Sequence, residues 1–274
     1  MSASVSYDPA IALDFFKSAG KPTRVAGSSV IFAEKESGKR LFSHSSKIYL
    51  LLSGEVSLLA ADKPIGTVKI GEIFGELAAI THAPRSATAI ARTDCKLIAL
   101  DDAEFEAALA KKPAFALMLM GILIGRLRET VARLTAAGAL AKGDEWQEAV
   151  AFDPQRIEDL VRGLSSDPPL YFQQGRQIMG EGQKALLMYA VIKGRVAISI
   201  GGRVVERLGP GGAFGEAALV DQSPRLATAV AETDCELQPI NRTAFLTLIK
   251  VSPQFAYSML GSLAERLRFL TARL

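Results

Sequence analysis

The sequence predicts a mainly β fold with flanking helices (α+β), in which two small β barrels or jelly rolls each carry a short N-terminal helix and a C-terminal closing helix. Two observations support this prediction. The 274 residues are enough for two domains of ordinary size. Residues 49–134 also match residues 189–274 at a constant offset of 140, with 30 identities in 86 positions and no gap. The chain is therefore interpreted as two copies of one unit.

Each copy opens with a helix signal. Asp8-Pro9 and Asp153-Pro154 each pair an N-cap residue with a proline at the first helical position. These pairs are offset by 145 residues, so the first copy is expected to carry five extra residues, placed around residues 39–46.

Strand and closing-helix signals follow in the same order in both copies. Residues 48–59 and 188–200 alternate in hydrophobicity and are bounded by glycines, which is typical of short strands joined by tight turns. A helical stretch then begins near Pro113 and again near Pro253. In the second copy its apolar positions are spaced four and three apart, which predicts a packing seam, formed by Leu263, Leu267, Leu270 and Leu274. The predicted organisation is a first domain at 1–140, a linker at 141–152 and a second domain at 153–274.

Composition excludes several classes of function. The net charge is only +3 and no block of Lys and Arg occurs, so no nucleic-acid partner is expected. The most apolar run, residues 114–125, has twelve residues against the ~20 needed to cross a bilayer, which favours a buried or dimer-interface helix and no membrane partner. The N-terminus lacks a signal-peptide pattern, so the expected location is the cytoplasm. A homodimer through the closing helices and packing of these helices within one chain both stay open.

Soft metal ligands and catalytic motifs are scarce. A tetrahedral zinc site would need both histidines and both cysteines, His44, His82, Cys95 and Cys235, and the cysteines are expected to be small core residues instead. No catalytic triad or phosphate-binding loop is visible, because the GEGQK segment at 180–184 is too short for that pattern. We therefore expect no enzymatic activity, no metal and no cofactor.

The segment that indicates a ligand occurs twice. It reads FGELAAITHAPRSATA at 74–89 and FGEAALVDQSPRLATA at 214–229, and in both an arginine follows a Gly-Glu pair nine residues after the glutamate. A short helical turn after the Gly-Glu pair would offer unpaired N–H groups to a phosphate, and the arginine would add a charge-assisted bond. A carboxylate beside a phosphate needs a different donor, such as a sugar hydroxyl. An anion with a neighbouring hydroxyl suggests a nucleotide.

This segment resembles the phosphate-binding cassette of cyclic nucleotide-binding domains, and the resemblance covers roughly residues 8–134 and 153–274. It implies two β jelly-roll barrels of the cyclic nucleotide-binding type. It also implies that Glu76 and Glu216 bind the ribose 2'-hydroxyl, that Arg85 and Arg225 pair with the cyclic phosphate, and that N–H groups of Ala78, Ser86, Ala218 and Leu226 complete the anion site. The expected sites are Gly75, Glu76, Leu77, Ala78, Arg85, Ser86, Ala87 and Thr130 in the first copy, and Gly215, Glu216, Ala217, Ala218, Arg225, Leu226, Ala227 and Thr271 in the second.

The same resemblance also implies which residues contact the purine base of the nucleotide. Thr130 falls where the catabolite activator branch of this family places a hydroxyl that contacts adenine, and Thr271 lies beside the matching position, which is Leu270. The residue after the phosphate arginine helps to bind guanine in this family when it carries a hydroxyl. Ser86 is therefore compatible with cyclic GMP as well as cyclic AMP, whereas Leu226 favours cyclic AMP.

These expectations lead to one function and one alternative. The chain should be a stand-alone receptor for a cyclic nucleotide, with cyclic AMP as the expected ligand at two sites. It would change conformation on binding and act on an unidentified effector protein, since no further segment for output follows Leu274. The alternative is a scaffold or dimerisation module with degenerate pockets, or a receptor for cyclic di-GMP.

Overall fold

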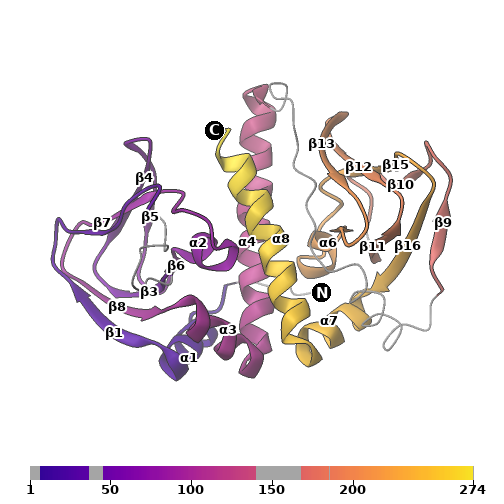
Figure 1. Ribbon diagram of the computed structural model, residues 1–274. Helices are drawn as coiled ribbons and strands as arrows, with labels where there is room; N and C mark the ends of the chain where they lie inside the picture. Colours follow the sequence, from indigo (N-terminus) through magenta and orange to yellow (C-terminus); the bar gives the residue numbers. More distant parts are fainter. Residues whose placement is uncertain (1–6, 37–45, 140–167, 185, 274) are drawn as a thin grey trace. The chain divides into compact units, whose positions relative to one another are not determined.

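The computed structural model describes residues 7–36, 46–139, 168–184 and 186–273 (Figure 1). The chain divides into two compact units, Tyr7–Ala116 and Leu117–Leu274. The predicted linker at 141–152 and the helix predicted to open at Asp153-Pro154 lie outside the described residues. The predicted domain boundaries stay predictions.

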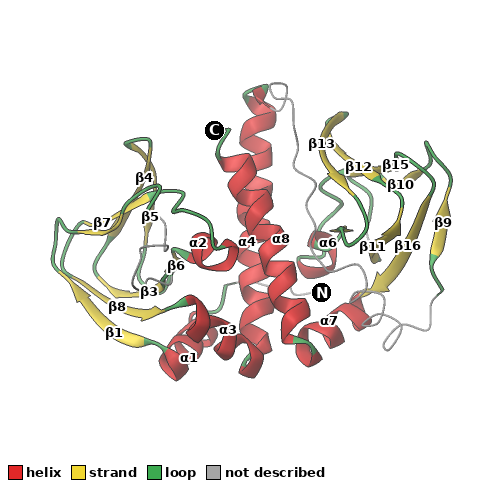
Figure 2. Ribbon diagram, in the orientation of Figure 1, coloured by secondary structure: helices red, strands yellow, loops and turns green. Residues whose placement is uncertain are grey.

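The first unit holds an antiparallel barrel built from two four-stranded sheets, with strand orders β1-β8-β3-β6 and β2-β7-β4-β5 (Figure 2). Buried residues of both sheets form its core, among them Leu51 and Leu97 of the first sheet and Val56 of the second. The strands are β1 (Lys21–Val25), β2 (Val30–Phe32), β3 (Ile48–Ser53), β4 (Val56–Ala60), β5 (Lys63–Val68), β6 (Ile73–Phe74), β7 (Thr88–Ala91) and β8 (Cys95–Leu100).

Helices precede, interrupt and follow the first barrel. Helix α1 (Pro9–Ala19) begins at the predicted signal, because the Asp8 carboxylate accepts a hydrogen bond from the Ala10 N–H at 2.8 Å. Its Phe15 ring stacks on Phe115 with 3.6 Å between ring centroids, and this contact holds the helix in place. The other helices are α2 (Glu76–Thr81), α3 (Asp102–Lys111) and α4 (Pro113–Ala136), of which α4 continues into the second unit.

The second unit repeats the barrel, with strand orders β9-β16-β11-β14 and β10-β15-β12-β13. The prediction of two jelly-roll barrels with flanking helices is thereby confirmed. The strands are β9 (Leu170–Phe172), β10 (Gln177–Met179), β11 (Leu187–Lys193), β12 (Val196–Ile200), β13 (Arg203–Leu208), β14 (Ala213–Phe214), β15 (Thr228–Ala231) and β16 (Cys235–Asn241), and the helices are α6 (Ala217–Val220), α7 (Arg242–Val251) and α8 (Pro253–Thr271).

Strand register locates an insertion in the first copy. Val25 pairs with Cys95 and Phe172 pairs with Cys235, so the strands at the start of the two barrels are offset by 147 residues. From Tyr49 and Tyr189 onward the offset is 140, as both tyrosines pair with the phenylalanine of the cassette. The first copy therefore has seven extra residues between these two points. The expected count of five was taken from Asp8 and Asp153, and Asp153 lies outside the described residues, so that count stays a prediction.

The closing helices begin at the predicted prolines. Helix α4 starts at Pro113 and α8 at Pro253, where the Ser252 side chain accepts a hydrogen bond from the Phe255 N–H at 3.2 Å. The predicted seam residues Leu263, Leu267 and Leu270 are buried. The short helices α3 and α7 were not predicted, although Asp101 and Glu104 form a capping box that signals the start of α3.

Within the described residues, no single helix is long and apolar enough to cross a membrane. Helices α3 and α4 meet that test of length and composition only when they are taken together across a bend.

Candidate functional site

The repeated cassette of the second unit turns the chain sharply at Gly215. This residue follows strand β14, has a positive φ of 87°, and precedes the single turn of helix α6. A Cβ atom at this position would lie 2.4 Å from Nη1 of Arg225. Glycine is therefore required for two reasons: a backbone conformation that other residues rarely adopt, and the close approach of the arginine.

Arg225 is buried at the end of the same cassette, with 7% of its surface exposed. Its guanidinium donates hydrogen bonds to the carbonyl oxygens of Gly215 at 2.9 Å and Leu187 at 2.5 Å. Burial lowers the pKa of Arg225, while Tyr189 and Glu216 act in the opposite direction. These two bonds use two of the five guanidinium N–H groups, so the side chain is oriented and still able to donate to an anion.

Glu216 belongs to a buried cluster of charges that also contains Arg266 of α8 and Glu206 of β13. Nη1 of Arg266 donates to Oε1 of Glu216 at 2.8 Å, and its Nε lies 2.9 Å from Oε2 and 3.1 Å from Oε1 of Glu206. Burial raises the pKa of Glu206, against the attraction of Arg266. Burial alone would lower the pKa of Arg266, but the two carboxylates outweigh it and raise the pKa. The arginine is thus a permanent cation between two acids.

The second oxygen of Glu216 is different. Oε2 is buried and has no hydrogen-bond partner among the described residues. Leaving a buried carboxylate oxygen without a donor costs roughly 1 to 3 kcal/mol. A ligand that supplied a hydroxyl at this point would remove that cost.

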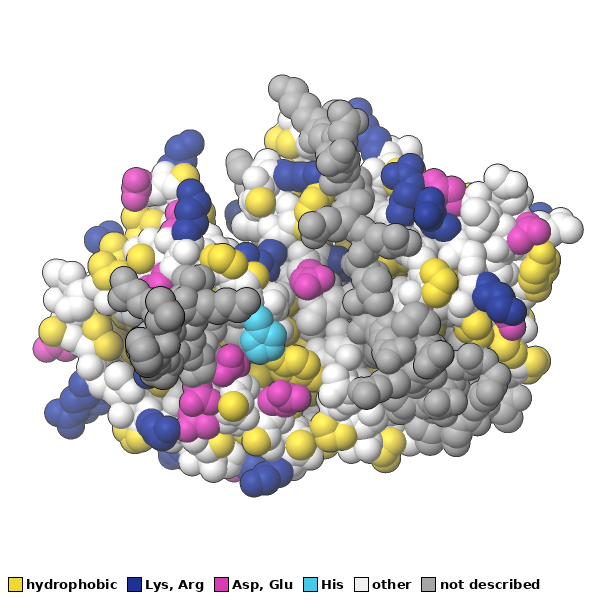
Figure 3. All heavy atoms as spheres, viewed as in Figure 1, with side chains coloured by type: hydrophobic (Ala, Val, Ile, Leu, Met, Phe, Trp, Pro, Cys, Tyr) yellow, Lys and Arg dark blue, Asp and Glu magenta, His cyan; other side chains and the backbone are white. Residues whose placement is uncertain are grey.

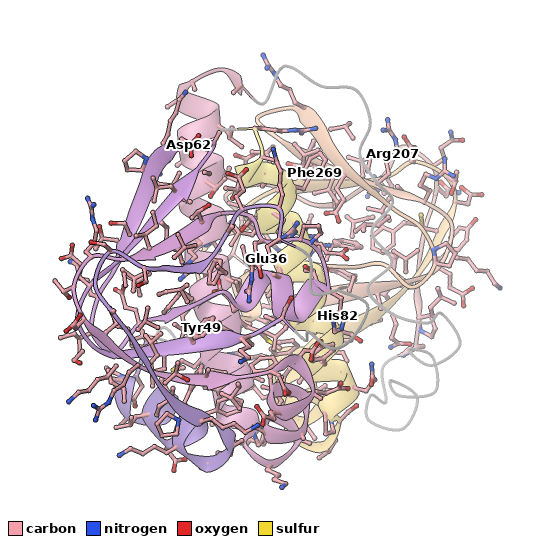
Figure 4. All side chains as sticks on the ribbon, turned by 60° about the vertical axis from the view of Figure 1, so that its left-hand side comes forward. Glu36, Tyr49, Asp62, His82, Arg207 and Phe269 are labelled. Carbon is pink, nitrogen blue, oxygen red and sulfur yellow. The ribbon has the colours of Figure 1, made fainter. Side chains whose placement is uncertain are left out.

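The cassette and the closing helices of the second unit enclose one cavity. Its lining includes Glu216, Arg225 and other residues of the cassette, together with many apolar side chains. Phe269, labelled on the yellow helix in Figure 4, belongs to this wall. The remaining apolar wall residues come from both barrel and helices and include Leu127 and Val131 of α4, Ile198, Ile200 and Val205 of the barrel, and Leu270 of α8.

Seven of the eight residues predicted for the second site line this cavity. They are Gly215, Glu216, Ala217, Ala218, Arg225, Leu226 and Ala227. Thr271, the eighth, is not among the lining residues; its neighbours Phe269 and Leu270 are. Glu206 and Arg266 are lining residues that sequence reasoning missed. Arg266 lies in an Arg-Leu-Arg block that occurs at 126–128 and again at 266–268, but the sequence indicated no role for it. Glu206 is not part of the repeat, because the matching residue of the first copy is Gly66.

The cassette of the first unit has the same local geometry. Arg85 donates to the carbonyl oxygens of Gly75 at 2.8 Å and Lys47 at 2.9 Å, as Arg225 does to Gly215 and Leu187. The backbone N–H of Arg85 is bonded to the Glu36 carbonyl at 2.9 Å, and Tyr49 lies in the same barrel (both are labelled in Figure 4). The guanidinium also lies 4.2 Å from the ring centroid of Phe32. Burial lowers the pKa of Arg85 as well.

The other residues predicted for the first site lie on helices α2 and α4 and in the cassette. Glu76 and Ala78 are buried in helix α2, which Gly75 precedes without a side-chain cap, so N–H groups of its first turn, including that of Leu77, lack an intrahelical acceptor. Ser86 is exposed, and Ala87 is buried. Thr130 is buried on α4. Its proposed contact with a base stays a prediction.

Metal ligands do not come together in the described part of the chain, where no group of three or more His, Cys, Asp or Glu side chains could hold an ion. Cys95 and Cys235 are buried, and each thiol donates to backbone carbonyls on its own barrel. His82 is exposed, and His44 lies outside the described residues.

On the face shown in Figure 3, the basic and acidic side chains are interspersed.

Comparison with known families matches both barrels. The family model described as the cyclic nucleotide-binding domain matches residues 24–112 and 169–252, which together make up more than half of the chain. The chain belongs to the cyclic nucleotide-binding domain family. It carries this domain twice, in tandem, as the resemblance of the two cassettes implied.

Two curated relatives share part of this tandem cyclic nucleotide-binding region. A cAMP-dependent protein kinase regulatory subunit from Eremothecium gossypii is 29% identical over 202 residues, which are 73% of this chain and 39% of the relative. A cGMP-dependent protein kinase from Toxoplasma gondii is 29% identical over 188 residues, which are 68% of this chain and 17% of the relative. The chain therefore spans less than half the length of either relative.

Comparison with solved structures also gives matches. The regulatory domain of Toxoplasma gondii PKA with cAMP is 24% identical, with a TM-score of 0.32, covering 89% of this chain and 85% of that one. The regulatory subunit of a cAMP-independent protein kinase A from Trypanosoma brucei is 18% identical, with a TM-score of 0.33, covering 92% of this chain and 90% of that one. The family assignment rests on the sequence match.

Proposed function

We propose that this chain is a receptor with two sites for cyclic nucleotides, and that cyclic AMP is the ligand of the second site. One observation carries the proposal. The lining of the cavity of the second unit combines a buried arginine, a buried glutamate with one carboxylate oxygen that has no partner, and apolar side chains that include an aromatic ring. An anion, a hydroxyl and a flat apolar ring in one molecule describe a cyclic nucleotide.

The roles of the residues follow from this arrangement. Arg225 and the N–H groups of Ala218 and Leu226 bind the cyclic phosphate, because an arginine fork and backbone donors both suit a phosphate oxygen. Glu216 accepts the ribose 2'-hydroxyl. In the first site Arg85, Glu76 and the N–H groups of Ala78 and Ser86 take the same roles.

Base preference differs between the sites. Leu226 offers no hydroxyl to a guanine, which favours cyclic AMP in the second site, whereas Ser86 is compatible with cyclic GMP in the first. Phe269 and Leu270 cover the apolar end of the second cavity and supply contact area for a purine. Thr130 is proposed to contact the base of the first ligand, and Thr271 that of the second.

The output of the receptor is proposed to be a change of conformation that acts on a separate effector protein. A ligand shifts such an equilibrium only if it binds one state better than the other. The relative from Eremothecium gossypii is named a regulatory subunit of a protein kinase, which supports a kinase as the class of effector. The chain itself is proposed to be non-catalytic and cytoplasmic.

Isothermal titration of the purified chain with cyclic AMP and cyclic GMP tests the proposal. The expected result is saturable binding of cyclic AMP, with two molecules bound per chain. Cyclic GMP is expected to occupy the first site alone. No heat and no thermal shift with either nucleotide would overturn the proposal. A response to cyclic di-GMP alone, or to none of the three, would establish the alternative receptor or the scaffold.

A further inference from the structure

The guanidinium of Arg266 is shared among three acceptors in the second cavity. Nε faces the carboxylate of Glu206, Nη2 donates to the carbonyl oxygen of Ala213 at 2.6 Å, and Nη1 donates to Oε1 of Glu216. Side chains of all three charged residues are at least 87% buried, since 13% of Arg266, 9% of Glu206 and 5% of Glu216 is exposed. Water therefore does not compete for these bonds.

Because the N–H groups of the Arg266 guanidinium are shared among three acceptors, only one of them bonds to Glu216. An arginine beside a carboxylate favours two parallel bonds, one to each oxygen. Arg266 instead makes a single bond to Glu216, because its Nε side is held by Glu206 and its Nη2 by Ala213. The second oxygen of Glu216 is consequently left for another donor.

The arrangement is specific to the second unit. Glu206 pairs with Ile198 across strands β12 and β13, and in the first barrel the same register places Gly66 opposite Leu58. The arginine and the cassette glutamate recur in both copies, as Arg126 and Glu76 in the first, but the second acid does not.

We propose that Glu206 is a positioning residue for the second site: it holds the Nε side of Arg266, so that Arg266 takes one oxygen of Glu216 and leaves Oε2 for a hydroxyl of the ligand. The inference rests on the proposed function, which supplies the hydroxyl as the ribose 2'-hydroxyl of a cyclic nucleotide. Without Glu206, the fork of Arg266 would turn onto both oxygens of Glu216, and the ligand hydroxyl would lose its acceptor.

The test compares cyclic AMP with 2'-deoxy cyclic AMP at the second site alone. The full chain carrying Arg85→Ala, which removes the first site, serves as the background for titration calorimetry. In this background 2'-deoxy cyclic AMP should bind about tenfold to a hundredfold more weakly than cyclic AMP, as expected for a lost hydrogen bond to a charged group. This ratio of the two dissociation constants is called the deoxy penalty below.

Three variants in this background separate positioning from a structural role. Glu206→Met is similar in length and offers no acceptor to Nε, so the deoxy penalty should fall below about threefold. Glu206→Gln keeps an amide oxygen for Nε and should retain most of the penalty. Glu236→Met makes the same substitution in strand β16, at an ion pair with Lys193 outside the cavity, and should leave the penalty unchanged.

Each outcome has one meaning. If cyclic AMP does not bind the unmutated chain, the proposed function fails. If it binds, and Glu206→Met keeps the full deoxy penalty, the positioning role fails while the function stands. Should Glu206→Met not fold, Glu206→Gly replaces it, because the first barrel carries glycine at this register. The same collapse of the penalty is expected, and an undiminished penalty overturns the inference.

Discussion

Arg128 of helix α4 forms a two-point ion pair with Asp221, in the cassette of the second unit. Nε lies 2.6 Å from Oδ2 and Nη2 lies 3.2 Å from Oδ1. The same Nη2 donates to the carbonyl oxygen of Pro224 at 3.0 Å, directly before Arg225. Helix α4 also lines the cavity with Leu127 and Val131. Helix α4, which follows the first barrel, thus holds the loop that carries Arg225.

Removing this ion pair should weaken the second site. Arg128→Ala is expected to lower the affinity for cyclic AMP at that site about threefold to tenfold, because the loop before Arg225 loses its restraint. Arg133→Ala, an exposed arginine on the same helix, serves as the control and should have no effect. In urea unfolding, a cycle of Arg128→Ala and Asp221→Asn should give a coupling of about 1 to 2 kcal/mol. Additive effects would contradict a direct pair.

Loss of a phosphate arginine should abolish one site at a time. Arg225→Ala leaves a buried phosphate without its counter-charge, which costs on the order of 3 to 5 kcal/mol, or a few hundredfold or more in affinity. Titration calorimetry of Arg225→Ala and Arg85→Ala should each show one site in place of two. The double variant should show none at micromolar cyclic AMP. Unaltered affinity in the double variant would rule out both arginines as phosphate ligands.

Gly215→Ala should act through Arg225. The added Cβ would lie 2.4 Å from Nη1 and would sit at a φ of 87°, so the guanidinium must leave the Gly215 carbonyl. We expect the affinity at the second site to fall about tenfold, the worth of one bond to a charged group. Gly261→Ala is the matched control, because nothing lies within 4 Å of its added Cβ in helix α8. It should keep the affinity and raise the stability by about 0.5 to 1 kcal/mol.

The sequence repeat predicted the two barrels because, at an offset of 140 residues, identical residues meet the same structural requirement in both copies. Gly54 and Gly194 show this: each has a positive φ, and an added Cβ would lie 2.6 Å from the backbone oxygen of Asp94 or 2.2 Å from that of Asp234, directly before β8 and β16. Both cassettes could likewise be predicted from local spacing, since in each copy the arginine lies ten residues after the glycine whose carbonyl oxygen it contacts.

Features without a counterpart in the other copy were not predictable in this way. Glu206 matches a glycine, so the repeat hides it, and its role depends on Arg266, 60 residues away. Leu127 and Val131 line the cavity beside the second barrel although they precede that barrel in sequence, and no local sequence pattern predicts this. The prediction of Thr271 rests on its hydroxyl, whereas the residues of α8 that line the cavity follow the helical period and include Phe269 and Leu270.

The pH dependence of stability should carry a contribution from Asp234. Its carboxylate accepts a hydrogen bond from the Gln174 N–H at 2.8 Å, and this bond, with a second from Tyr171, lowers the pKa of Asp234 below its ordinary value of 3.8. Because the pKa of Asp234 is lower in the folded than in the unfolded chain, its contribution to the free energy of unfolding is complete above the unfolded pKa. That contribution disappears as the pH falls through the folded pKa. Asp234→Asn should therefore lower the urea midpoint at pH 7, and the difference from the unmutated chain should shrink as the pH falls below 3.8. Asp62→Asn removes a carboxylate from the exposed turn between β4 and β5 and should show neither effect. A difference that stayed constant from neutral pH to acid would show that the charge of Asp234 does not stabilise the fold.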